Sequence, residues 1–127
     1  MSLVYSTGPL ENQIDASAAK SSTTVYTKVL NNHKHTTITA KIEVFRLDGT
    51  KTLIDTATLT ISPNSSGFHV SDVSNAFEFE VQIKISPSRD INDVLIGVFG
   101  KDAAGNLNPS HRLVHKELTR IRKLTIE

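Results

Sequence analysis

Five histidines are the first residues of this chain whose type and spacing suggest chemistry. His33 and His35 are two positions apart, so they share one face of an extended strand and could bind a metal ion together. Lys34 lies between them and no carboxylate is near in the sequence, so solvated histidines in a turn are the simpler interpretation. We therefore expect no metal site and no other cofactor.

A second histidine pair, His111 and His115, lies in a basic stretch near the C-terminus. Residues four apart also share a strand face, and Arg112 and Lys116 directly follow the two histidines. This combination favours a recognition patch, or ordinary surface, over a zinc site. The basic stretch 111–123 lacks the stacking aromatic residues of a nucleic-acid-binding surface, so we expect a charged edge strand and no nucleic-acid partner.

No catalytic arrangement stands out among the serines and carboxylates. The G-x-S-x-G nucleophile elbow and a glycine-rich phosphate loop are absent, and the lack of cysteine excludes disulfides, thiolate ligands and a thiolate nucleophile. Glu78 and Glu80 share one face of a predicted strand and could form an acid–base pair. Gln82 and Lys84 continue the same row, which is typical of a solvent-exposed sheet face. We therefore expect a protein that is not an enzyme.

Charge and hydropathy limit the kinds of partner that this chain can have, but they do not indicate its cellular compartment. The 127 residues include 14 Lys and Arg against 13 Asp and Glu, so no global field draws the chain to nucleic acid or to an anionic membrane. No apolar run approaches the roughly 18 residues of a transmembrane helix, so membrane insertion is not expected. No signal peptide is visible, and the localisation stays open.

The elements that would position these residues are strands. The segment 36–47 alternates apolar and polar residues, and the apolar parity shifts at Phe45, which either a β-bulge or a strand end covered on both faces would explain. Asp48-Gly49 then predicts a type I′ turn into a strand over 51–61. The segment 94–99 is apolar on both parities, which predicts a strand that is covered on both faces.

The run 77–85 is the clearest strand, with one face directed to the core and the other to water. Further strands are expected over 23–30, over 68–70 and within 113–126. These segments predict an all-β protein, an antiparallel β-sandwich of immunoglobulin-like or jelly-roll type with about 7–8 strands. The residues expected to face the core in the run 77–85 are Phe77, Phe79, Val81, Ile83 and Ile85.

Residues 1–22 predict an extended N-terminal arm ahead of a β-sandwich domain over 23–127. The short apolar patch Leu3-Val4-Tyr5 is followed by the breaker Gly8-Pro9 and by a polar stretch. One interpretation is a disordered tail. The other is that Leu3, Val4 and Tyr5 add as a strand to a neighbouring copy, with Gly8 and Pro9 directing the chain from one subunit to the next.

Two stretches carry a resemblance to known proteins. The run 98–107, Val-Phe-Gly-Lys-Asp-Ala-Ala-Gly-Asn-Leu, resembles the strand and D-x-x-G-N turn near the end of bacterial immunoglobulin-like domains. That resemblance implies a spacer, an adhesion module or a fibre subunit. The layout, through segments 3–9 and 105–115, is similar to small β-sandwich proteins of spore-forming Firmicutes, some relatives of which build surface appendages from subunits with N-terminal connector arms.

The second resemblance implies a location on the cell or spore surface. Appendage subunits of that kind use cysteines in the arm for cross-links, and this chain has none. Any assembly would therefore depend on strand addition and packing.

Two functions are expected from these observations. The first is a non-catalytic structural module that assembles with copies of itself, as a homo-oligomer or fibre, through its arm and edge strands. The second is a binding module for carbohydrate or for another protein. The aromatic residues are few and several are assigned to the core, which disfavours a carbohydrate ligand.

Overall fold

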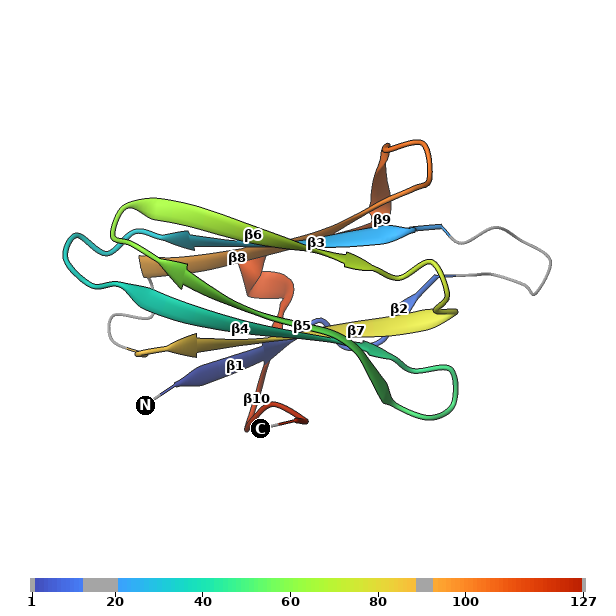
Figure 1. Cartoon of the computed structure of the whole chain (residues 1–127), viewed down its shortest axis with the longest axis horizontal. Helices are drawn as coiled ribbons and strands as arrows, with labels where there is room; N and C mark the ends of the chain where they lie inside the picture. The colour runs from blue at the N-terminus through green and yellow to red at the C-terminus, as the bar shows by residue number, and fades with distance from the viewer. Residues whose placement is uncertain (1, 13–20, 89–92, 127) are drawn as a thin grey trace.

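The computed structural model describes residues 2–12, 21–88 and 93–126. Two antiparallel sheets pack face to face (Figure 1), so the predicted all-β sandwich is confirmed, with ten strands in these residues. Sheet A has the order β10-β1-β7-β4-β5, with β2 also paired to β7, and sheet B has the order β6-β3-β8-β9. Sheet A comprises β1 (Leu3–Ser6), β2 (Leu10–Glu11), β4 (Ile38–Arg46), β5 (Thr52–Ile61), β7 (Glu78–Ser86) and β10 (Thr119–Ile121). Sheet B comprises β3 (Thr24–Asn31), β6 (Ser65–Asp72), β8 (Val94–Lys101) and β9 (Leu107–Leu113).

The core lies between the sheets and is built by alternate residues of each strand. Burial of each such valine, isoleucine or phenylalanine stabilises the fold by roughly 1.5–3 kcal/mol. Both central strands of sheet A follow the predicted alternation on this side. The buried residues that β4 and β7 contribute are Ile38, Ala40, Ile42, Val44, Phe79, Val81, Ile83 and Ile85.

The hairpin between β4 and β5 is confirmed. Asp48 and Gly49 both have positive φ, 22° and 89°, but pairing ends at Arg46 and Thr52, so residues 47–51 form a longer connection than the predicted two-residue turn. The register of the β4–β5 pair shifts between Val44 and Phe45, and the extra residue is Ile54 of β5, not a residue of β4. The register of β4 with β7 is continuous, so Phe45 lies opposite Glu80 on the outer face of sheet A by ordinary alternation, and it is buried because that face is covered there.

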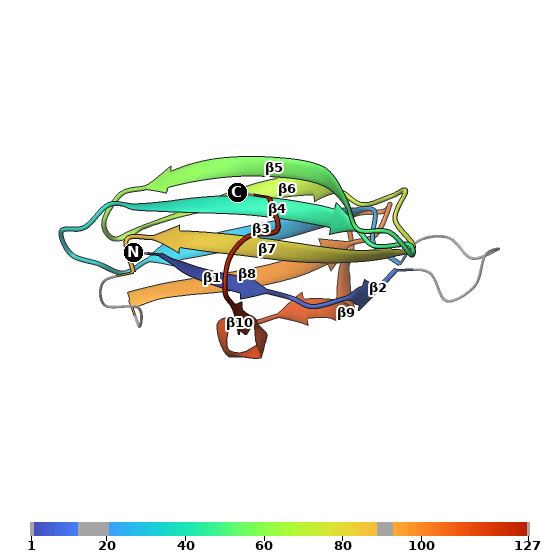
Figure 2. The same ribbon diagram turned by 90° about the horizontal axis from the view of Figure 1, so that it is seen from below.

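The prediction of a solvent-exposed face along β7 is wrong for its middle residues. Glu80 and Gln82 are only 8% and 2% exposed, whereas Phe77, expected in the core, precedes the strand and is 49% exposed. Lys51 and Ser6 contact Glu80, and the chain that follows β10 covers Gln82 as it crosses the outer face of sheet A over β1 and β7 toward β4 (Figure 2). Segments distant in sequence thus cover the polar row.

The segment expected to form an arm is part of the sandwich in the single chain. Strand β1 lies between β7 and β10, and Val4 and Tyr5 are buried there. Asn12 closes the segment, because its side-chain amide donates to the carbonyl oxygens of Ser22, Val73 and Ala76. Residues 3–12 therefore belong to the folded domain and not to an extension that ends at residue 22.

The outer face of sheet B is open, which corrects a second expectation. Strand β8 was predicted to be covered on both faces, yet Leu95 is 43% exposed. The inward side of β8, with Val94, Ile96 and Val98, is buried as expected. The final predicted strands also differ, since a single helical turn over His115–Glu117 separates β9 from β10.

Candidate functional site

The five residues predicted to mediate self-assembly lie along the first strand and the turn after it. Leu3, Val4 and Tyr5 pair with β7 on one side, and Val4 and Tyr5 also pair with β10 on the other. Gly8 has a φ of +69°, a conformation that favours glycine, and Pro9 is exposed beside it. This turn leads the chain to β2, which pairs with β7 as well, so both strands stay on sheet A.

The predicted recognition patch is divided by the fold. His111 is buried and His115 is half-buried, whereas Arg112 and Lys116 are exposed. Arg112 lies opposite Phe99 across the β8–β9 pair. The two cations therefore belong to the open face of sheet B, and the two histidines have structural partners.

His111 forms a buried contact with a serine that resembles a nucleophile–base pair. Its Nε2 lies 2.5 Å from the carbonyl oxygen of Glu11, so Nε2 carries the proton and Nδ1 accepts from the Ser22 hydroxyl at 2.7 Å. The Asn108 amide also donates to Ser22 Oγ. Ser22 is 0% exposed, so no substrate can reach its hydroxyl. The hydrogen bond between His111 and the Glu11 carbonyl instead links β9 to β2.

His115 also has structural partners, which lie in β1 and β8. Its ring lies 4.9 Å from the ring of Tyr5, and its Nδ1 accepts from the backbone N–H of Ile96. Burial lowers the pKa of His115, which keeps the ring neutral and able to accept this bond. The histidine therefore packs the turn 115–117 against β1 and β8.

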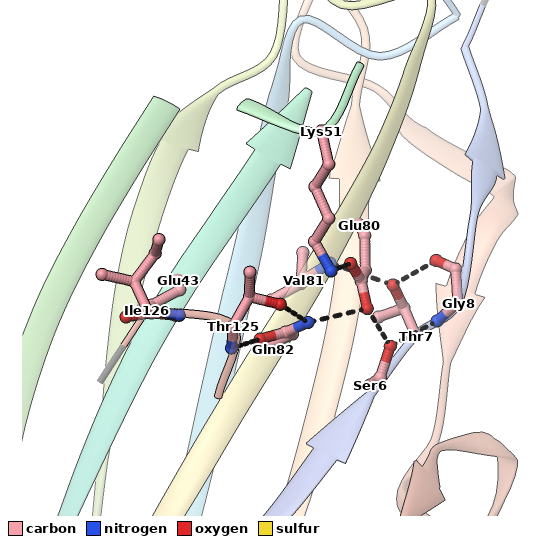
Figure 3. Close-up of polar contacts among 10 residues, drawn as sticks. All are labelled: Ser6, Thr7, Gly8, Glu43, Lys51, Glu80, Val81, Gln82, Thr125 and Ile126. Atoms are coloured by element: carbon pink, nitrogen blue, oxygen red, sulfur yellow. Dashed lines mark hydrogen bonds and ion pairs between the residues drawn. The ribbon is translucent and has the colours of Figure 1, made fainter. Parts of the chain in front are cut away.

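A carboxylate network occupies the outer face of sheet A (Figure 3). Glu80 accepts from Ser6 Oγ at 2.5 Å and from Gln82 Nε2 at 3.1 Å, and it forms an ion pair with Lys51 at 2.7 Å. Burial alone would raise the pKa of Glu80, but the hydrogen bonds from Lys51, Ser6 and Gln82 and the Lys51 charge together hold it below its ordinary value. Glu80 is thus an ionised acceptor with satisfied partners, unsuited to act as a general acid.

The C-terminal segment, residues 122–126, closes over this network. Gln82 exchanges two hydrogen bonds with Thr125, both of 2.9 Å, and the backbone N–H of Ile126 donates to Glu43 (Figure 3). Leu124 is fully buried although it lies outside the core between the sheets. These contacts secure the segment to β7 and β4, so this face is a packed structural region and not an open site.

The free edges of the two sheets differ in their protection. Strand β9 contains Pro109 and a register shift, and β10 has three residues that include Arg120. Strand β5 has ten residues with Asp55 as the single charged one, no lysine and no proline, and among the described residues it pairs with β4 only. Short, charged or interrupted edges resist strand addition. Strand β5 also has a register shift, at Ile54, and one charge, at Asp55; it differs from β9 and β10 in its length of ten residues and in the uncharged, proline-free stretch 56–61.

A hollow of about 520 Å³ lies beside this edge, between the ends of β5 and β6. Gly67 of β6 lies close to β5, since a Cβ at that position would be in contact with the Ile61 side chain at 3.4 Å. Asp55 and His69 link the same two strands by a hydrogen bond of 2.8 Å. Strands β5 and β6, which are edges of the two sheets, therefore lie close together, and the hollow lies at one end of this pair.

The open face of sheet B carries a row of three aromatic rings, one from each of β6, β3 and β8. Tyr26 stacks on Phe99 with a centroid distance of 5.2 Å and an angle of 3°, and on Phe68 at 6.1 Å and 24°. The sequence analysis missed this row because it assigned several aromatic residues to the core. A signal was present, since Tyr26 has the opposite parity to Val25 and Val29 in the strand.

The candidate metal residues do not assemble into a site. His33 is buried and its Nδ1 lies 2.8 Å from Asn31 Oδ1, which corrects the prediction of a solvated turn histidine. Within the described part of the chain, no three His, Cys, Asp or Glu residues are grouped closely enough to hold a metal ion. In that same part, no helix has the length and hydrophobicity needed to cross a membrane.

No family model matches this chain, and no curated protein or solved structure is significantly similar to it. The function is therefore inferred from the residues and contacts described above.

Proposed function

We propose that this chain is a non-catalytic structural module that associates with copies of itself, mainly through the edge of strand β5. The observation that carries the proposal is the length and composition of that edge: ten residues, one charge and no proline. An exposed strand of this kind presents unpaired backbone N–H and C=O groups to another strand. A second copy offers the same edge, and two such edges can pair antiparallel around a twofold axis.

The side chains along β5 suit this pairing. Thr56, Thr58 and Thr60 are exposed on the outer face, so they tolerate a neighbouring strand without burying a charge. The hydrogen bond with His69 gives a partner to Asp55, which is the one carboxylate of the strand. Strand addition at β5 would extend sheet A across two subunits.

The N-terminal strand offers a second route to assembly. Val4 and Tyr5 are buried, and β1 of another copy would find the same partners in β7 and β10. Exchange of an identical element is a general route to oligomers and fibres. A place on the cell or spore surface fits such a module and rests on the sequence resemblance to bacterial immunoglobulin-like domains and appendage subunits.

Light scattering and electron microscopy over a wide range of protein concentration test the proposal. We expect oligomers that Thr60→Lys disrupts, because a charge on an edge strand opposes pairing. Thr39→Lys is the matched control: Thr39 lies directly opposite Thr60 on the same face, but in the internal strand β4. A protein that stays monomeric throughout, or equal disruption by both variants, would show the edge proposal to be wrong.

A second function, binding of another protein, is favoured by the exposed apolar face of sheet B. Carbohydrate is the weaker alternative, because a sugar stacks on an open ring face and the faces of Tyr26 are directed at Phe68 and Phe99.

A further inference from the structure

The outer face of sheet B concentrates the exposed apolar side chains of the molecule. Eight large apolar residues of the described chain are exposed, and six of them lie on this face. Phe68 is 55% exposed and Leu107 is 59% exposed. Exposed apolar groups gathered in this way mark interaction sites in soluble proteins. The six residues are Leu30, Phe68, Val70, Leu95, Leu107 and Val114.

Two hollows lie at different places on this face. One, of about 620 Å³, is bounded by Leu30, Leu95 and Val114. The other, of about 410 Å³, is bounded by Phe99 and Leu107. The stacked rings of the aromatic row lie on the same face, with Phe99 forming part of the second hollow. Hollows of this size accept apolar side chains of a partner at the well-packed centre of an interface.

The cations on this face form no ion pair with an acidic side chain of the described residues. Lys28 lies over Phe68 at 5.6 Å and Lys101 lies over Tyr26 at 4.4 Å, which are cation–π contacts. Arg112 and Lys116 border the two hollows. None of these four cations forms an ion pair with a carboxylate of residues 2–12, 21–88 or 93–126.

The nearby carboxylates are engaged within their own turns. Asp72 accepts from the backbone N–H and the hydroxyl of Ser74. Asp102 accepts from the backbone N–H groups of two residues in its turn, and Glu117 accepts from the N–H of Val114. These hydrogen bonds come from neutral donors and leave the three carboxylates charged, so the face carries both signs, and its four cations outnumber these acids by one.

We infer that the outer face of sheet B binds a protein partner that presents acidic residues interspersed with apolar ones. The apolar residues would enter the hollows, and the carboxylates would meet Lys28, Lys101, Arg112 and Lys116. Opposite charge on the partner speeds association, and it disfavours binding of partners that carry like charge. A second copy of this chain is disfavoured as the occupant, because two such faces would bring like charges together.

The geometry of the rings favours protein over nucleic acid. Single-stranded nucleic acids bind by stacking bases on open aromatic faces. Here Tyr26 is stacked between Phe68 and Phe99, and Lys28 lies near the faces of both phenylalanines. Aliphatic and aromatic side chains of a protein can pack on such a surface without an open ring face.

A random peptide library displayed on phage and selected on the full-length protein tests the inference. We expect the selected peptides to be enriched in Asp and Glu together with Leu, Phe, Tyr or Trp. Synthetic fluorescein-labelled copies should then bind with an affinity that falls as salt is raised from about 50 to about 500 mM, because salt screens exposed charges. Amide shifts on binding should be confined to β6, β3, β8, β9 and the adjoining residues 114–116.

Two variants and a matched control locate the site. Phe68→Ser and Lys28→Glu should each weaken peptide binding about tenfold or more, as loss of a central contact does. Phe77→Ser, at an exposed phenylalanine of similar exposure before β7, should leave binding unchanged. All three proteins should unfold at similar urea concentrations, because these side chains lie outside the core.

Four results would overturn the inference. One is enrichment of basic peptides, and another is equal loss of binding in the Phe77 variant. A third is binding of a single-stranded oligonucleotide or an arrayed glycan that Phe68→Ser abolishes. The last is a self-association that Phe68→Ser abolishes, since this would assign the face to a second copy. These readouts do not depend on β5, so failure here and failure of edge-strand assembly are distinguishable.

Discussion

Replacement of Glu80 by glutamine tests whether the network on the outer face of sheet A stabilises the fold as an ionised cluster. The substitution keeps the shape of the side chain and removes its charge. In the wild-type protein one carboxylate oxygen accepts from Ser6 and Gln82, and the other forms an ion pair with Lys51. Glutamine cannot accept on both of its terminal atoms, so at least one of these interactions is lost.

The expected cost follows from the burial of each partner. A hydrogen bond to a charged group contributes about 1.5–3 kcal/mol, and the Ser6 hydroxyl that donates here is buried. Lys51 is 36% exposed, so its ion pair adds less than about 1 kcal/mol. Because the amide oxygen can still accept one bond, we expect Glu80→Gln to lower the free energy of unfolding by about 1–3 kcal/mol at neutral pH.

The pH dependence gives a sharper readout. The pKa of Glu80 is lower in the folded protein than in the unfolded chain, because its hydrogen bonds and the Lys51 charge outweigh burial. Such a group stabilises the fold fully above its unfolded pKa of about 4.3, and the stabilisation is lost as the pH falls through the lower folded pKa. The difference between wild type and Glu80→Gln should therefore shrink on acidification.

Urea unfolding followed by far-UV circular dichroism, at about pH 7 and about pH 3, measures both effects. Glu78→Gln is the control, since Glu78 lies two residues earlier on the same face of β7 and is not buried. The reasoning would be refuted if the two substitutions cost the same at neutral pH. A cost for Glu80→Gln that stays constant down to pH 3 would refute it as well.

Two further pairs of substitutions test packing, both by urea unfolding. Leu124→Ala should cost about 2–4 kcal/mol because Leu124 is fully buried on the outer face of sheet A, whereas Ile126→Ala, at a 48% exposed residue, should cost less than about 0.5 kcal/mol. Equal costs would contradict a secured C-terminal segment. Gly100→Ala should cost about 1–3 kcal/mol because the new Cβ would lie 2.9 Å from the Cβ of Ser22, whereas Gly97→Ala in the same strand meets nothing within 4 Å and should be nearly neutral. Similar tolerance at both glycines would contradict the tight contact.

The sequence predicted those elements well whose structure depends on residues that lie close together in the chain. Asp48-Gly49 predicted the hairpin correctly, because turn conformation depends on adjacent residues, whereas the parity change at Phe45 reflects a covered outer face and not a bulge in β4. The inward residues of β7 were also correct from Phe79 onward. Each of these predictions needed only the order of residues within one segment.

The errors arose where a distant segment determines burial. Alternation marks two faces of a strand but not what covers the outer one, so Gln82 was expected in water and is buried beneath Thr125 and its neighbours. The patch at Leu3 to Tyr5 is too short to show periodicity, and its partner β7 lies far along the chain. Nothing local distinguishes such a strand from a tail.

The sequence did not predict the open face of sheet B, for a related reason. Tyr26, Phe68 and Phe99 belong to three separate strands, and only the pairing register brings their rings together. Apolar residues on both parities of β8 were interpreted as two buried faces, whereas the outward ones border hollows at the surface. A single strand cannot distinguish a buried face from an exposed binding face.

The position of β1 between β7 and β10 has a consequence for how the molecule is made. Val4 pairs with Ile121, so sheet A cannot be completed on the ribosome until the stretch containing β10 has emerged. Until then the first strand lacks one neighbour, and the polar row of β7 lacks its cover. Chains in which distant segments must meet fold slowly, through intermediates that expose apolar surface and tend to aggregate. Translation speed and chaperone supply should therefore influence the yield of this protein more than its final stability does.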